Sequence, residues 1–177
     1  MPIRRTALLI SFAAIALVAG GQTMPHQKKN AAKAAGGAMI VNPGSEKWGD
    51  LPAAAMVGTP SVEMGGKMQV AILQGDPMTA GRSYTVRLSC TDGTKIAPHW
   101  HPTTENVTVI KGGAAVGMGS KWDDALLKDV PVGGFFSAAP HMTHFAQCKG
   151  DSILQVHGIG PFVLNFVSPG QTQPGQK

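Results

Sequence analysis

At 177 residues the chain has the length of one ordinary domain, and charged residues make up only 14% of it. The net charge of +5 lies near the N-terminus, because residues 41–177 contain ten basic and ten acidic side chains. This distribution argues against a basic nucleic-acid-binding face on the body of the chain. The 23 glycines and 13 prolines favour short strands joined by tight turns over a helical bundle.

Residues 1–20 are predicted to be a signal peptide. Arg4 and Arg5 precede an apolar run over residues 7–19, and small residues follow at 18–20. The run is short against the ~20 residues that span a bilayer, which favours cleavage over a retained membrane anchor. The paired arginines leave the export route open. Residues 21–42 are predicted to be a flexible linker, and residues 43–177 to form one folded domain. Because of the signal peptide, we expect a periplasmic or secreted protein.

The rest of the chain predicts strands. In Ser83–Cys90, every second residue from Tyr84 to Cys90 is apolar, which predicts a strand with that face inward. Turn signals stand at residues 75–77, 92–93 and 112–113. Only residues 123–127 suggest a helical turn. No internal repeat is visible, so we expect a single antiparallel all-β barrel or sandwich. The predicted strands are 68–73, 83–90, 95–101, 105–110, 114–118, 134–137, 144–147, 152–157 and 162–167.

One segment combines two histidines with a glutamate. Side chains alternate along a strand, so His99 and His101 project from one face with Trp100 opposite, and Glu105 begins the returning strand. The two histidines alone fit a surface pair or a hydrogen-bonded pair as well as they fit a metal site. An inward-facing glutamate favours a metal site, because a buried carboxylate without a cationic partner is very costly.

These residues carry a resemblance to the cupin superfamily. Its first motif has the spacing Gly, five residues, His-x-His, three residues, Glu, six residues, Gly, and it is matched at every position by Gly93, His99, His101, Glu105 and Gly112. The sequence also resembles small single-domain cupins with a Pro-His-Trp-His-Pro…Glu first motif, most of them without an assigned function. The resemblance covers about residues 45–170 and implies a cupin jelly-roll β-barrel.

The second cupin motif is matched only in part. Gly134 and Pro140 fit its start, whereas Met142 stands where glycine is usual, His144 comes one residue early, and no asparagine follows. The resemblance implies a metal site formed by His99, His101, Glu105 and His144.

Two further histidines, His141 and His157, each have alternative interpretations. His141 competes with His144 as the fourth ligand, and we favour His144, with His141 at the rim or supporting a ligand. His157 is interpreted as a core histidine in preference to a hydrogen-bond donor behind a ligand or an acid–base group.

The ligand set predicts one divalent metal ion and does not distinguish Fe, Mn, Ni, Cu or Zn. The resemblance is compatible with a small-molecule oxygenase in which Glu105 detaches to act as a base, and also with a non-enzymatic periplasmic protein that binds a metal or small ligand. The expected partner is a small neutral molecule, with no nucleic acid and no membrane anchor after leader cleavage; a homodimer remains open. The expected pocket lining is apolar, without an inward arginine: Val107, Val109, Val116, Met118, Phe136, Met142 and Phe145.

The chain has two cysteines, Cys90 and Cys148, both expected to point inward. Exactly two cysteines in an exported protein favour a disulfide. Separate buried thiols, or a thiolate near the metal, remain as alternatives.

Overall fold

The computed structural model describes residues 38–168, so the predicted signal peptide and most of the predicted linker lie outside the described residues. Within 38–168, no helix is long and apolar enough to cross a membrane. Short 3-10 helices cover Ala53–Ala55 and Asp124–Leu126. The strands are β1 Met56–Val57, β2 Met68–Gly75, β3 Ser83–Cys90, β4 Lys95–Trp100, β5 Glu105–Met118, β6 Lys128–Pro131, β7 Phe135–Ala138, β8 His144–Ile159 and β9 Leu164–Phe166.

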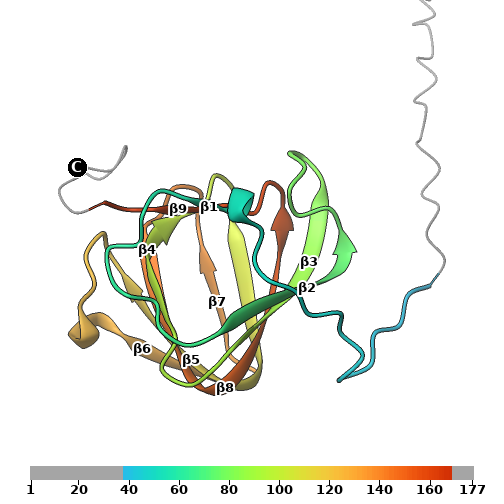
Figure 1. The fold of residues 1–177 in the computed structure, drawn as a ribbon, viewed down its shortest axis with the longest axis horizontal. Helices are drawn as coiled ribbons and strands as arrows, with labels where there is room; N and C mark the ends of the chain where they lie inside the picture. The colour runs from blue at the N-terminus through green and yellow to red at the C-terminus, as the bar shows by residue number, and fades with distance from the viewer. Residues whose placement is uncertain (1–37, 169–177) are drawn as a thin grey trace, which may run out of the picture. The chain divides into compact units, whose positions relative to one another are not determined.

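The strands form one sheet that curls around a common interior (Figure 1). One path runs β1-β9-β4-β8-β3-β2. Strand β8 pairs with β3 and β4 along one edge and with β5 along the other. The far edge of β5 pairs with β7 and β6. All of these pairings are antiparallel except the short β1–β9 contact. The prediction of an all-β, antiparallel barrel is therefore confirmed, and β8 is the strand that joins the two parts of the sheet.

The alternation of buried and less buried residues along the strands shows which face of the sheet forms the core. Every second residue of β3, from Tyr84 to Cys90, is buried, as predicted. In β5 the same period buries Glu105, Val107 and Val109. Each fully buried valine or leucine contributes about 1.5–3 kcal/mol through burial of apolar surface. The glutamate therefore begins a strand whose inward face is otherwise apolar.

The turn predicted at residues 112–113 is wrong, because β5 continues through it as one strand. Gly112 has a φ of 68° and marks an irregularity in the β5–β8 register. The Ser152 hydroxyl donates to the Gly113 carbonyl at 2.7 Å and accepts from the Gly113 amide at 3.1 Å. A side chain on Gly112 would collide with Ser152. A glycine of positive φ permits a β-bulge as readily as a turn, and here it forms the bulge.

Other differences concern short or joined strands. The strands predicted at 144–147 and 152–157 are one strand, β8. Strands β1 and β6 were not predicted, because both are short and mostly exposed and so lack an alternating pattern. The predicted helical turn is confirmed at Asp124–Leu126, where Asp123 caps it by accepting from the Ala125 amide at 2.9 Å.

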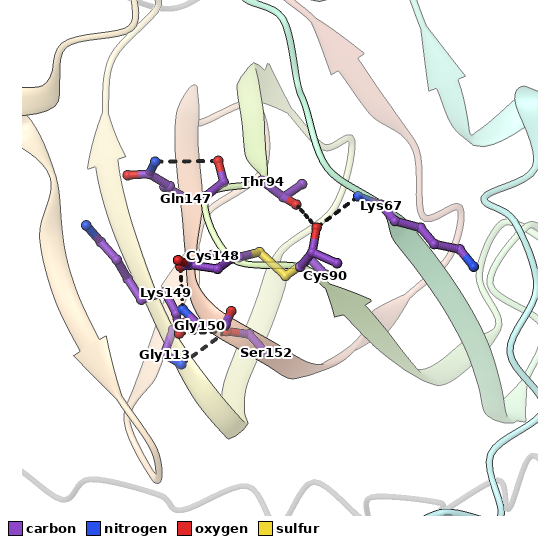
Figure 2. Close-up of a disulfide and its surroundings, with 12 residues drawn as sticks. Lys67, Cys90, Thr94, Gly113, Gln147, Cys148, Lys149, Gly150 and Ser152 are labelled. Carbon is purple, nitrogen blue, oxygen red and sulfur yellow. Dashed lines mark hydrogen bonds between the residues drawn. A yellow bond between two sulfur atoms is a disulfide. The ribbon is translucent and has the colours of Figure 1, made fainter.

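Cys90 and Cys148 form a disulfide, which confirms the favoured alternative (Figure 2). The bond joins the end of β3 to β8, and both cysteines are buried. Backbone hydrogen bonds surround it: the Cys148 amide donates to Thr94 O at 2.9 Å, and the Gly93 amide donates to Cys148 O at 3.0 Å. The turn that leads into β4 is therefore fixed to β8 by covalent and polar contacts.

Candidate metal centre

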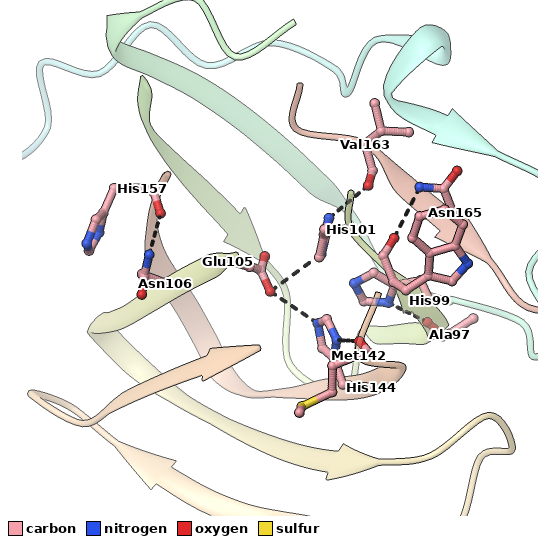
Figure 3. A network of polar contacts seen from close by, with 11 residues as sticks. Ala97, His99, His101, Glu105, Asn106, Met142, His144, His157, Val163 and Asn165 are labelled. Carbon is pink, nitrogen blue, oxygen red and sulfur yellow. Dashed lines mark hydrogen bonds and ion pairs between the residues drawn. The ribbon is translucent and has the colours of Figure 1, made fainter. Parts of the chain in front are cut away.

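Three histidines from two strands meet inside the barrel (Figure 3). His99 in β4 lies directly opposite His144 in β8, and His101 follows the end of β4. The three are only 1–3% exposed. One ring nitrogen from each lies within 4.8 Å of the others, a spacing that could hold a metal ion. The inward convergence predicted from the His99–Trp100–His101 alternation is confirmed.

The hydrogen bonds of these rings define their tautomers. Nδ1 contacts a backbone carbonyl in each case: Ala97 O at 2.7 Å for His99, Val163 O at 2.8 Å for His101, and Met142 O at 3.1 Å for His144. A carbonyl oxygen only accepts, so each Nδ1 carries a proton. In the neutral rings the lone pair then lies on Nε2, the arrangement typical of metal-binding histidines. These contacts could not be predicted from the sequence, because any residue type can supply a carbonyl.

Glu105 lies beside two of these nitrogens. Its Oε2 is 3.1 Å from His144 Nε2 and 3.5 Å from His101 Nε2, and its side chain is 7% exposed. A neutral His144 would place two acceptors face to face at 3.1 Å. A proton on His144 Nε2 or a cation near both atoms removes that repulsion. The carboxylate is thus placed to stabilise positive charge at the histidine cluster.

The pKa values of the metal-free residues follow from burial and from this contact. Burial lowers the pKa of His99 far below its usual range, and the neighbouring imidazoles lower it further. Burial would raise the pKa of Glu105, but His101 and His144 outweigh it and hold that pKa well below normal. Burial would lower the pKa of His144, whereas the hydrogen bond and charge of Glu105 raise it. Without a metal, this contact therefore favours a proton on His144 and a negative charge on Glu105.

The residues fit a divalent ion. Among the described side chains, His101 Nε2 is fully buried and has no hydrogen-bond partner. An unpaired polar atom inside a barrel is costly unless a ligand satisfies it. Nitrogen and carboxylate donors suit several divalent transition metals and do not select one. Glu105 as a fourth ligand remains a prediction, since the 4.8 Å cluster consists of the three histidines.

A small cavity lies next to the cluster. Its volume is about 20 Å³, which is room for roughly one water molecule. Of the residues predicted to line a pocket, Val107 and Phe136 do so. Met118 and Met142 are instead 46% and 42% exposed. Phe145 is buried on the other side of β8, where its ring packs on Trp122 at 5.0 Å. The cavity is lined by Leu88, Ile96, His99, Glu105, Val107, Phe136, His144, Ala146, Leu154 and Val156.

The two other histidines among residues 38–168 lie away from the cluster. His141 is exposed, and its ring packs on Trp100 at 4.7 Å, so the structure favours His144 as the inward residue of the pair. His157 is also exposed, and the interpretation as a core histidine is wrong. In the second half of β8 the buried positions are Ser152, Leu154 and Val156, which puts His157 on the outer face. That alternation is readable in the sequence and could have placed it correctly.

Comparison with known proteins agrees with this architecture. No protein-family model matches the sequence, and no curated protein sequence matches it. A solved structure of a putative acetylacetone dioxygenase from Methylibium petroleiphilum PM1 superposes with a TM-score of 0.55 at 21% identity, covering 78% of this chain and 87% of that one. The protein has the cupin fold. At this identity the similarity extends to the fold alone.

Two further solved structures are similar to this cupin barrel at lower TM-scores. KdgF from a Halomonas species has a TM-score of 0.48 and 18% identity, covering 69% of this chain and 92% of that one. An RmlC-like cupin from Shewanella frigidimarina NCIMB 400 has a TM-score of 0.44 and 20% identity, covering 55% and 81%.

The cupin barrel also explains how an incomplete second motif still presents His144. Glycine is usual at position 142, but here the residue with positive φ is His141, at 62°. The tight turn before β8 is thus made at His141, and His144, three residues later, is buried. Met142 contacts the His144 ring through its backbone carbonyl, and a methionine supplies a carbonyl as well as a glycine does.

Metal binding by this protein should release protons and strengthen as the pH rises. Glu105 raises the pKa of His144 above its ordinary 6.5, so an ion must displace the His144 proton up to a higher pH than usual. Below that pKa, the apparent affinity for the metal ion should fall as the pH is lowered. Calorimetric titration with zinc(II) in buffers of different ionisation enthalpy counts the released protons.

The matched control is Glu105→Gln, which removes the charge that holds this proton while preserving the shape of the side chain. We expect fewer protons to be released by the variant near neutral pH. Equal proton release from both proteins would contradict the assignment of the proton to His144.

Proposed function

We propose that this protein is an exported cupin that binds one divalent metal ion through His99, His101, His144 and Glu105, and that the loaded protein is an oxidoreductase acting on a small molecule. The observation that carries the proposal is the set of three imidazoles with Nδ1 bonded to carbonyls and with one ring nitrogen of each within 4.8 Å of the others. Such a set favours a bound cation over a structural histidine cluster, because it leaves His101 Nε2 without a hydrogen-bond partner.

A bound ion would supply Lewis-acid or redox chemistry at this point. The chain itself supplies an apolar, water-poor enclosure, since the cavity lining contains no lysine or arginine. That lining supports a neutral ligand. Glu105 is held as an anion, which suits a ligand better than a strong base, because a carboxylate of low pKa attracts a proton only weakly. We therefore place Glu105 at the metal first, with proton transfer as a secondary role after it detaches.

Dioxygenase chemistry on a diketone-like molecule is the specific form we propose, by analogy with the putative acetylacetone dioxygenase of the same fold. Purified protein loaded with Fe(II) should consume oxygen in the presence of one member of a panel of diketones, flavonols and thiols. The matched control is the His101→Ala variant under identical conditions. No oxygen uptake with any metal or substrate would reject the enzymatic proposal and leave metal binding.

The second candidate is a non-enzymatic protein that binds a metal or small ligand. The cavity of about 20 Å³ favours it, because an organic substrate does not fit beside an ion without movement of the lining. Elemental analysis of protein purified from its native cells bears on both candidates, since it identifies the resident metal. A protein without stoichiometric metal would contradict the enzymatic proposal and the metal-binding form of the second candidate, and would leave the binding of a small ligand.

Export is supported by the leader pattern and by the disulfide, since disulfides persist in oxidising compartments. N-terminal sequencing of the mature protein should begin near residue 21. An N-terminus at Met1 or Pro2 would contradict cleavage.

A further inference from the structure

His141 has an unusual backbone conformation. Among the residues from 38 to 168, it is the one non-glycine residue with a positive φ, 62°. A side chain makes the left-handed region of backbone angles unfavourable, so a residue such as His141 keeps this conformation where surrounding contacts enforce it. Such residues concentrate at functional sites. Here the turn closes with a hydrogen bond from the Met142 amide to Ala139 O at 3.0 Å.

Two contacts join His141 to the strand that carries the first ligands. Its amide donates to the carbonyl of His101 at 2.9 Å. Its imidazole packs on the indole of Trp100, with ring centroids 4.7 Å apart. Trp100 stands between His99 and His101, and its own carbonyl accepts from Asn165 Nδ2 at 3.3 Å. His141 therefore contacts both the backbone and the outward side chain of the His-x-His segment.

The same turn also orients the third histidine. Directly after His141, the Met142 carbonyl accepts from His144 Nδ1 at 3.1 Å (Figure 3). A change in the turn would move this carbonyl and rotate the His144 ring. The turn thus connects ligands from β4 and β8 that are more than 40 residues apart in the chain.

We propose that His141 is a positioning residue, which clamps the His-x-His segment against the turn before β8 and so holds the three imidazoles at metal-binding distance. The inference rests on the proposed metal site. It assigns His141 a role outside the ligand set, acting through the Trp100 contact and the His101 carbonyl.

The ring contact can be tested separately from the backbone. His141→Ala removes the ring, and His141→Phe retains an aromatic surface for Trp100 but cannot bind metal. His157→Ala is the matched control, because it also removes an exposed histidine but lies far along β8. Each variant is titrated with cobalt(II) and zinc(II), the cobalt(II) absorption spectrum is recorded, and amide hydrogen exchange of the metal-free protein is measured.

We expect His141→Ala to bind both ions roughly tenfold more weakly, the scale found when residues that support metal ligands are removed. Its cobalt(II) spectrum should change, and amides from 139 to 144 should exchange faster even without metal. His141→Phe should restore affinity, spectrum and exchange, and His157→Ala should match the wild type. Wild-type affinity in His141→Ala, or no rescue by His141→Phe, would overturn the proposal.

These outcomes separate the two proposals. If the wild type binds metal and His141→Ala binds equally well, the positioning role fails and the metal site stands. If no protein binds metal, the proposed function fails, and unchanged hydrogen exchange in His141→Ala then rejects the clamp as well.

Discussion

Replacing His101 with alanine is expected to lower bound metal several-fold while leaving the barrel folded. His101 is 3% exposed, and its Nε2 has no hydrogen-bond partner among the described residues, so the substitution removes a ligand without breaking a hydrogen bond of that atom. The lost contacts are those of Nδ1 with Val163 O, of Nε2 with Glu105 Oε2 and of the ring with Phe162. The carbonyl left unpaired costs about 1–3 kcal/mol, less than a domain's stability. Metal content after dialysis and the Tm of the metal-free protein measure the two effects.

His157→Ala is the control for this experiment, since it removes an exposed imidazole of the same barrel. It should retain the metal content of the wild type. Full metal retention in His101→Ala would reject the site, whereas loss of metal in both variants would point to binding at surface histidines.

Removing the disulfide is expected to destabilise the barrel by about 4 kcal/mol. The bond closes a segment of 58 residues that contains β4, β5, β6 and β7, and this figure is the loop-closure entropy that the unfolded chain regains without the cross-link. Urea unfolding of the Cys90→Ala/Cys148→Ala variant, compared with the oxidised wild type, measures the free energy. Cavities left by two buried cysteines are small, so the chain-entropy term should dominate.

The reduced wild type serves as the matched control for the cysteine variant. It should unfold at nearly the same urea concentration as the double variant, because both lack the cross-link and keep the same strands. An unchanged midpoint on reduction would contradict a stabilising disulfide in the folded protein.

The sequence identified the inward face of the site because short-range alternation determines it. His99, His101 and Glu105 are confirmed as buried neighbours, and their positions follow from the two-residue period of a strand. His144 required a choice against His141 that local pattern could not make. The structure places His144 inside, after a turn with a positive φ at His141, and the contacts of that turn with Trp100 and His101 come from a distant part of the chain.

Strand lengths could not be predicted from local signals. Gly112–Gly113 in β5 and Lys149–Asp151 in β8 have the composition of turns, but the chain passes both places without reversing. Whether such a segment reverses or bulges depends on pairing with a strand about 40 residues away, as in the contact of Gly113 with Ser152. The small cavity is equally non-local, because Phe136 and Leu154 that line it come from different strands.

The position of β8 near the end of the chain has a consequence for folding kinetics. This strand pairs with β3, β4 and β5, all of which precede it, so the pairing of the three strands with their shared partner is complete only after residue 159 is available. A nascent chain that ends before β8 would expose unpaired strand edges. Pairings of such long sequence separation are slow to form, and we expect refolding on the millisecond-to-second scale of other β-barrels. The metal ligands would come together in the same late step, since His144 is the first residue of that strand.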